Sequence, residues 1–380
     1  ALTVNGEAGS DTLNVDDSGD GTINDGVLTG STITGLDMPV GITYSTLETL
    51  NIDLGLAGDT FTIQSTHFGA TNLNTQAGGD TVLVETTSGI TTIETEGGSD
   101  TINVRTIDAA TIIRAGDQND TINVGTLAPT GGGTLNEINA PLTIEGDPDY
   151  DILNLDDSGD PNPNSGTITA TQILGFGMTA AITYATIEQV DFAFGDGGTD
   201  LTIAGTSCDS TFNLATGGGD DVINIQATCG ALNVNLQGGD DVANLGSLAP
   251  TMGGTLNNLG DLISLNAGSG FDMLNVDDTA DAADNTGTLT ATAIRGLGTG
   301  SGIDYQGFEN LEMFLGAGND TLSVGGTMVG AGGYRTITTV ETGGGGDDVT
   351  IDLQANSDGF FTLNAGAGND TLNAATSTLP

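Results

Sequence analysis

The sequence predicts an all-β protein: a parallel β-helix (β-solenoid) with about twenty residues per rung, in a single continuous stack with very little helix. Three observations predict this fold. A glycine-rich turn, an aspartate and an alternating strand recur along the chain, the aspartates are evenly spaced, and no window of helical length keeps apolar residues at the 3.6-residue period. The 62 glycines also lack the strict third-residue spacing of collagen.

The short repeat describes one rung of such a solenoid. It appears, for example, as AGGDTVLV (77–84), GGSDTINV (97–104) and GGGDDVINI (217–225). Glycine allows the positive φ of a tight corner, aspartate accepts hydrogen bonds in the turn, and alternate apolar residues of the strand point inward. Because a lone rung cannot bury its apolar face, we expect the rungs to stack on one another.

A longer repeat is superimposed on the short one. It starts with LNVDDSGD at Leu13, LNLDDSGD at Leu153 and LNVDDTAD at Leu274. We therefore divide the chain into three repeat units, residues 1–145, 146–266 and 267–380. No change of composition separates them, which favours sequence units of one solenoid over independent domains.

The charge balance excludes two classes of partner. The chain has 51 acidic residues, four arginines and no lysine, with a net charge of -47. Such a field repels nucleic-acid phosphates and anionic lipid heads, so neither nucleic-acid binding nor membrane association is expected. No stretch approaches the roughly 18 consecutive apolar residues of a membrane span, so we expect no membrane insertion. Divalent cations are the natural counter-ions of this chain.

In-register rungs would align their turn aspartates in a column. At about 5 Å between neighbours and an effective dielectric of about 20, each pair of charges costs roughly 3 kcal/mol. Calcium would neutralise this column, because it accepts six to eight carboxylate and carbonyl oxygens in flexible geometry. The alternative is that these side chains only accept hydrogen bonds from turn N–H groups.

Two segments, GAGNDTLSV (316–324) and GAGNDTLNA (366–374), resemble the repeats-in-toxin calcium-binding repeats of secreted bacterial surface proteins. The resemblance implies a secreted β-solenoid that binds Ca²⁺. It departs from the family in having one such turn per roughly twenty residues, where family members place their nonapeptides back to back. The metal-bearing aspartates it implies are Asp320 and Asp370, and more weakly Asp80, Asp100, Asp120, Asp220, Asp240 and Asp347.

The two cysteines are 21 residues apart, which is one rung. Cys208 and Cys229 should therefore lie one above the other, with Cα atoms within the range that a disulfide requires. Secretion would favour oxidation, so we predict a disulfide, with buried free thiols as the alternative.

Catalysis is not expected. The paired acids Asp16-Asp17, Asp156-Asp157 and Asp277-Asp278 occur three times, whereas an active site is normally unique. The single histidine, His67, has no companion that the sequence would place beside it, so neither a zinc site nor a Ser-His pair is supported.

The function that these observations favour is structural: an extracellular adhesive rod or fibre in a cell-surface layer or matrix, stabilised by calcium. The chain starts and stops inside its repeat, which suggests either head-to-tail self-association into a filament or an excerpt of a longer surface fibre. A cell-surface or matrix polysaccharide is a further expected partner. The alternative function is a carbohydrate-binding or carbohydrate-cleaving β-helix protein.

Overall fold

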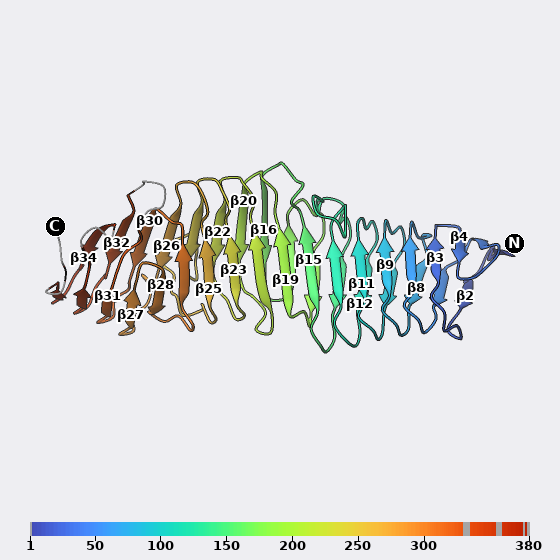
Figure 1. Ribbon diagram of the computed structural model, residues 1–380, viewed down its shortest axis with the longest axis horizontal. Coiled ribbons are helices and arrows are strands. Elements are labelled where there is room, and N and C mark those ends of the chain that lie inside the picture. The colour runs from blue at the N-terminus through green and yellow to red at the C-terminus, as the bar shows by residue number, and fades with distance from the viewer. Residues whose placement is uncertain (1, 330–334, 355–358, 375–376, 378–380) are drawn as a thin grey trace. The chain divides into compact units, whose positions relative to one another are not determined.

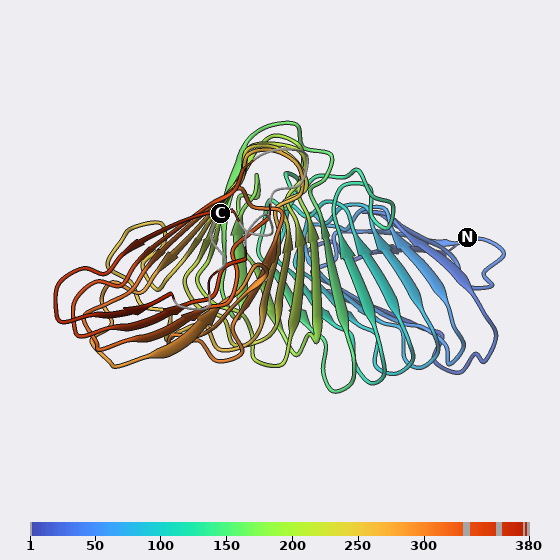
Figure 2. The same ribbon diagram turned by 60° about the vertical axis from the view of Figure 1, so that its left-hand side comes forward.

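The computed structural model describes residues 2–329, 335–354, 359–374 and 377. These residues contain 35 strands and no helix, and within each part of the chain the strands of successive rungs lie side by side (Figure 1). The chain divides into two compact units, residues 1–160 with 171–193 and residues 161–170 with 194–380. Figure 2 shows the same strands, and the corners that join them, from a second direction. The predicted parallel β-helix is confirmed within each unit.

The first unit contains two parallel ladders. One ladder consists of β3 (Asp25–Leu28), β7 (Thr60–Ile63), β9 (Thr81–Val84), β11 (Thr101–Val104), β13 (Thr121–Val124), β15 (Ile152–Asp156) and β19 (Gln189–Ala193). The other consists of β2 (Thr12–Asp16), β6 (Thr49–Asp53), β8 (Ala70–Asn74), β10 (Thr91–Glu94), β12 (Thr111–Arg114), β14 (Leu142–Glu145) and β18 (Ile182–Ala185). Strand β1 (Leu2–Asn5) pairs in parallel with β5 (Ile42–Ser45).

The second unit repeats this arrangement. One ladder consists of β16 (Asn164–Ile168), β20 (Thr199–Ile203), β22 (Val222–Ile225), β24 (Val242–Leu245), β26 (Met273–Asp277), β30 (Asn310–Phe314), β32 (Ile337–Glu341) and β34 (Phe360–Asn364). Opposite it are β21 (Thr211–Ala215), β23 (Leu232–Asn235), β25 (Ile263–Asn266) and β29 (Ile303–Gln306). A further run consists of β27 (Thr286–Leu289), β31 (Thr321–Val324), β33 (Asp348–Ile351) and β35 (Thr371–Asn373).

Three short strands are antiparallel to their neighbours. They are β4 (Thr32–Gly35) between β3 and β5, β17 (Gln172–Gly175) beside β18, and β28 (Ala293–Gly296) between β27 and β29. Each belongs to one of the three long sequence repeats. Each long repeat therefore contains one rung that carries an extra antiparallel strand.

The core of each unit is a set of apolar columns. In the first unit, Val82, Ile102, Ile122 and Leu153 are register partners on successive strands, and all four are completely buried. Burial of each such side chain contributes about 1.5–3 kcal/mol. Because strand side chains alternate, the intervening residues face outward, which explains the alternating burial along most strands.

Asparagines on the outward faces also stack in register. The Nδ2 group of Asn72 donates to Oδ1 of Asn51 at 2.8 Å, and Nδ2 of Asn51 donates to Oδ1 of Asn14 at 2.7 Å. In the second unit, Asn275, Asn244 and Asn224 form a similar chain at 2.8 and 3.0 Å. Each asparagine ladder ties neighbouring rungs together outside the core. None of the described residues forms a helix of the length and apolarity that a membrane crossing requires.

Candidate functional site

The aspartates of the short repeat form a hydrogen-bonded column, which we call the aspartate ladder. In the first unit it consists of Asp59, Asp80, Asp100, Asp120 and Asp151, and it ends at Glu188. The backbone N–H of each member donates to a carboxylate oxygen of the next, at 2.6–2.8 Å. Each ladder aspartate comes directly before its strand, where the turn of one rung lies against the turn of the next.

The second unit contains two further stretches of the same ladder. One runs from Thr199 through Asp221, Asp241 and Asp272 to Glu309, with N–H to carboxylate distances of 2.6–3.0 Å. The other runs from Asn285 through Asp320 and Asp347 to Asp370, at 2.9–3.1 Å. The pattern is therefore a general feature of the rung and is not confined to one place.

Six of the eight predicted metal ligands are ladder members, and two are not. Asp220 and Asp240 are exposed and precede the ladder residues Asp221 and Asp241 by one position. The Asp240 N–H donates to Asp220 Oδ1 at 2.8 Å, on the outside of the corner. The spacing of twenty residues holds for Asp220 and Asp240 as well as for Asp221 and Asp241. Only the second pair, which directly precedes the strands, is buried.

The sequence prediction also omitted ladder members. They are Asp59, Asp151, Asp221, Asp241 and Asp272, together with Glu188 and Glu309. The signal for the aspartates was their place directly before a strand. The signal for the glutamates was their recurrence at matching positions of the three long repeats, as Glu48, Glu188 and Glu309. Glu48 likewise accepts the Asp11 N–H, at 2.7 Å.

Most ladder aspartates are buried, and in many of them only one carboxyl oxygen has a hydrogen-bond partner. One oxygen accepts the N–H of the neighbouring rung, whereas Oδ2 of Asp80, Asp100 and Asp120 is buried without a hydrogen-bond partner. Burial raises the pKa of Asp100 to about 6 and that of Asp120 to about 8. In the second unit burial likewise raises the pKa of Asp221 to about 6 and that of Asp241 to about 7. These carboxyls therefore titrate near neutral pH, unlike exposed aspartates.

The ladder geometry provides the carboxylates with a role that needs no metal. Across the described residues, no three or more His, Cys, Asp or Glu side chains are grouped so that they could hold a metal ion. The ladder oxygens that accept N–H groups are already engaged. Calcium binding at Asp80, Asp100, Asp120, Asp220, Asp240, Asp320, Asp347 and Asp370 stays a prediction.

Two of the three pairs of acids hold a loop against the following rung, whereas Asp16 accepts hydrogen bonds from Ser18. Asp156 Oδ2 accepts the Gly133 N–H at 2.6 Å, and Asp157 Oδ1 accepts the Leu135 N–H at 2.9 Å. The equivalent pair, Asp277-Asp278, accepts N–H groups of Gly254 and Leu256 at 2.6 and 2.9 Å. Repetition of these acids thus accompanies a repeated structural contact.

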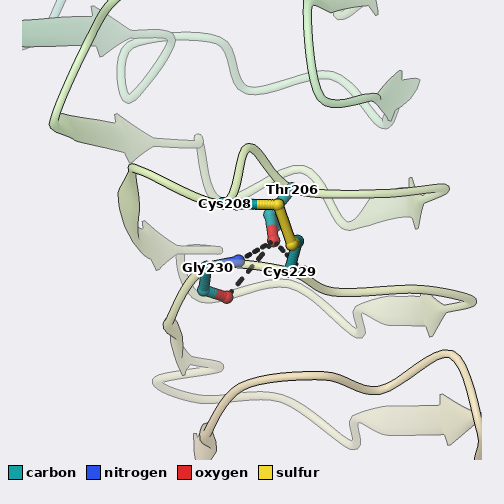
Figure 3. The surroundings of a disulfide bond; sticks show 4 residues. All are labelled: Thr206, Cys208, Cys229 and Gly230. Carbon is teal, nitrogen blue, oxygen red and sulfur yellow. Dashed lines mark hydrogen bonds between the residues drawn. A yellow bond between two sulfur atoms is a disulfide. The ribbon is translucent and has the colours of Figure 1, made fainter.

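Cys208 and Cys229 are joined by a disulfide across two neighbouring rungs, with Cα atoms 4.4 Å apart (Figure 3). Thr206 Oγ1 accepts the N–H groups of Cys229 and Gly230 at 2.9 and 3.1 Å, beside the disulfide. A covalent bond and a buried threonine therefore hold the same corner.

The corresponding corner of the first unit carries different residues. Thr66 Oγ1 accepts the N–H groups of Ser88 and Gly89 at 2.8 and 3.1 Å, as Thr206 does in the second unit. The next two residues are His67, which is partly buried, and Phe68, which is 93% exposed. Sequence reasoning assigned no site to this corner, although a lone histidine beside a phenylalanine interrupts the usual Gly/Ser/Thr composition of the turns.

The comparisons with known proteins return no matching family model and no curated protein with significant sequence similarity. The resemblance to repeats-in-toxin sequences therefore rests on the turn motifs alone. What the structure shows of this chain is a repetitive all-β stack, a parallel β-helix in each unit, held together by apolar columns and by the aspartate ladder.

Proposed function

We propose that the chain is an extracellular structural and adhesive element. The observation that supports this most is the repetition of the aspartate ladder, because the same buried contact joins rung after rung in both units. A structural element needs every rung to be secured, whereas a catalytic protein needs one distinctive place. The disulfide supports location outside the cytosol, since such bonds persist in oxidising compartments.

Self-association forms the second part of the proposal. Strands β2 and β34 have β6 and β32 as parallel partners, and alternate residues of both strands are exposed. Leu2 and Leu372, in the nearby β1 and β35, are each 54% exposed. An uncovered strand edge of this kind pairs readily with a strand from another chain, so a second copy, or a neighbouring segment of a longer surface fibre, would extend the stack.

The test is sedimentation together with electron microscopy of the purified chain. We expect concentration-dependent assemblies that weaken in the Leu372→Lys variant, because a charge would be placed in the contact. Leu56→Lys is the matched control, since Leu56 is 59% exposed but lies in the turn between β6 and β7. A monomer at every concentration would remove self-association and leave the structural role.

Calcium stays in the proposal as a counter-ion of the acidic surface. The net charge of -47 supports it, and Asp220 and Asp240 carry adjacent exposed carboxylates at one corner. Imaging with calcium and after EDTA tests whether assembly depends on the ion. Assemblies that persist unchanged in EDTA would restrict the acidic side chains to hydrogen bonding.

The second candidate function is carbohydrate binding. One observation favours it, the His67–Phe68 corner, because the residues of this corner depart from those of the equivalent corners in the other repeats. A carbohydrate-cleaving activity has less support, since two of the three pairs of acids are engaged with loop N–H groups.

A further inference from the structure

A depression of about 490 Å³ lies at the His67–Phe68 corner of the first unit. Hydroxyl groups line it from three successive rungs: Ser31 and Ser45, then Ser65 and Thr66, then Ser88. We propose that this depression binds a neutral saccharide, with Phe68 as the surface on which a sugar ring stacks. The inference deepens the adhesive role proposed above and rests on that role only for its biological use.

Phe68 is the most exposed large apolar side chain among the described residues, at 93%. A side chain so exposed contributes little to the core, and single exposed apolar residues are common on protein surfaces. What distinguishes Phe68 is its place on the rim of a depression that is otherwise rich in hydroxyls. An aromatic face beside hydroxyls matches a pyranose, which presents C–H groups on its faces and hydroxyls at its edge.

His67 forms part of the wall of the depression. Its Nδ1 lies 3.3 Å from Thr71 Oγ1, and its ring meets Tyr44 edge to face with centroids 5.9 Å apart. The other ring nitrogen, Nε2, is buried without a hydrogen-bond partner. Burial lowers the pKa of His67, so the imidazole is neutral at pH 7. Because Nε2 is enclosed by protein atoms, the sugar would be held by Phe68 and the surrounding hydroxyls, and His67 would sense it from the wall of the depression.

In the other repeats the same corner forms without a His-Phe pair. Thr206 and Thr327 each accept an N–H from the next rung, as Thr66 does. In the second repeat, Ser207 and Cys208 follow the threonine, and the third repeat has Met328 and Val329 there. The same turn thus forms with three different pairs of residues. The His-Phe pair is specific to one corner, as a binding site would be.

The charges around the depression select the class of saccharide. Among the residues that the structure describes, no arginine lines it, and the charged group that acts on His67 is the Glu48 carboxylate. With a net charge of -47 on the chain, sulfated or uronic sugars would be repelled. A neutral hexose or N-acetylhexosamine polymer fits, because it offers ring faces and hydroxyls without negative charge.

The sequence makes the test unusually direct, because the chain has one histidine and no tryptophan. Phe68→Trp introduces the chain's single tryptophan in the depression, which can be excited without exciting the five tyrosines. Ile23→Trp, at a side chain that is 75% exposed elsewhere, is the matched control. Cellohexaose and chitohexaose are the neutral probes, and polygalacturonate is the anionic probe. The imidazole ¹⁵N signals of the chain carrying the native Phe68 report on His67 without further assignment.

We expect a neutral probe to change the tryptophan emission of the Phe68→Trp variant and to shift the His67 signals, with a dissociation constant on the order of 1 mM. Phe68→Ala should weaken binding about fivefold to tenfold, and the Ile23→Trp control should not respond. Absence of any response up to about 10 mM of both neutral probes, or equal binding by Phe68→Ala, would overturn the site. Sedimentation of the same samples distinguishes failure of the saccharide site from failure of self-association. The proposed assembly contact lies at Leu372 and does not include Phe68, so Phe68→Ala should assemble as the unaltered chain does.

Discussion

Replacing Asp100 by asparagine should reduce the dependence of stability on pH. Asp100 is 2% exposed, accepts the Asp80 N–H at 2.7 Å, and has a buried Oδ2 without a partner. Its own N–H donates to Asp120, so ladder carboxyls face it from both neighbouring rungs. Asparagine keeps the accepting oxygen and removes the charge, which makes it the smallest change that tests the ionisation.

The magnitude follows from the pKa of Asp100, which burial raises from 3.8 to about 6. At about 1.36 kcal/mol per pKa unit, ionising this buried carboxyl costs roughly 3 kcal/mol of folding free energy. The folded chain binds more protons than the unfolded one, so this stability is present below about pH 4 and is lost as the pH rises through 6. About half of the loss, roughly 1.4 kcal/mol, falls between pH 5 and pH 8.

Urea unfolding followed by circular dichroism at pH 5, 6, 7 and 8 measures this effect. The range stays above the isoelectric point of about 4.1, where solubility is lowest. The free energy of unfolding of Asp100→Asn minus that of the unaltered chain should increase by about 1.4 kcal/mol across this range. Hydrogen exchange of the Asp80 amide reports the same change locally. Asp25→Asn, at an exposed aspartate of β3, is the control. Curves that shift in parallel for Asp100→Asn would refute the buried-carboxyl argument.

Three other outcomes are expected. Cys229→Ala should destabilise the chain by about 3 kcal/mol, because it opens a 21-residue loop. Reduction of the unaltered chain should produce the same loss in urea unfolding. Equal urea midpoints for the oxidised and reduced chains would contradict this. Gly98→Ala should lower the free energy of unfolding by more than about 2 kcal/mol, because Gly98 has φ of +142° and a Cβ there would lie 1.3 Å from the Gly78 carbonyl oxygen. Gly97→Ala is the control, since a Cβ at Gly97 meets nothing within 4 Å, and its melting temperature should be unchanged. Calcium should raise the melting temperature relative to EDTA by screening the acidic surface, and an identical melting curve in both would exclude a stabilising ion.

The fold could be predicted because its determinants are local and repeated. Val82, Ile102 and Ile122 occupy the same position of each short repeat, and in-register stacking follows once the period is known. The site was predicted less completely. A spacing of twenty residues fits Asp220 and Asp221 equally, and only the alternation of the following strand decides which of them is buried.

Features outside the repeat could not be predicted in this way. Periodicity gave no reason to examine Phe68, because the depression beside it forms only when three rungs bring their corners together. The role of Glu188 was similarly hidden. Glu188 lies 37 residues after Asp151, across a long rung, and takes the place of a ladder aspartate there. Its carboxylate accepts the Asp151 N–H at 2.8 Å. Such contacts join positions that the sequence separates by unequal distances.

The aspartate ladder has a direction. In each stretch the N–H of an earlier rung donates to the carboxylate of a later one, as from Asp80 to Asp100 and from Asp221 to Asp241. Detaching a rung at the later side strips an amide of its acceptor, whereas detaching one at the earlier side releases a carboxylate into water. The group left at either end then faces water, and a charged carboxylate gains far more from solvation than an amide does. The two ends of a stretch should therefore fray unequally, which gives the β-helix a built-in polarity for unzipping.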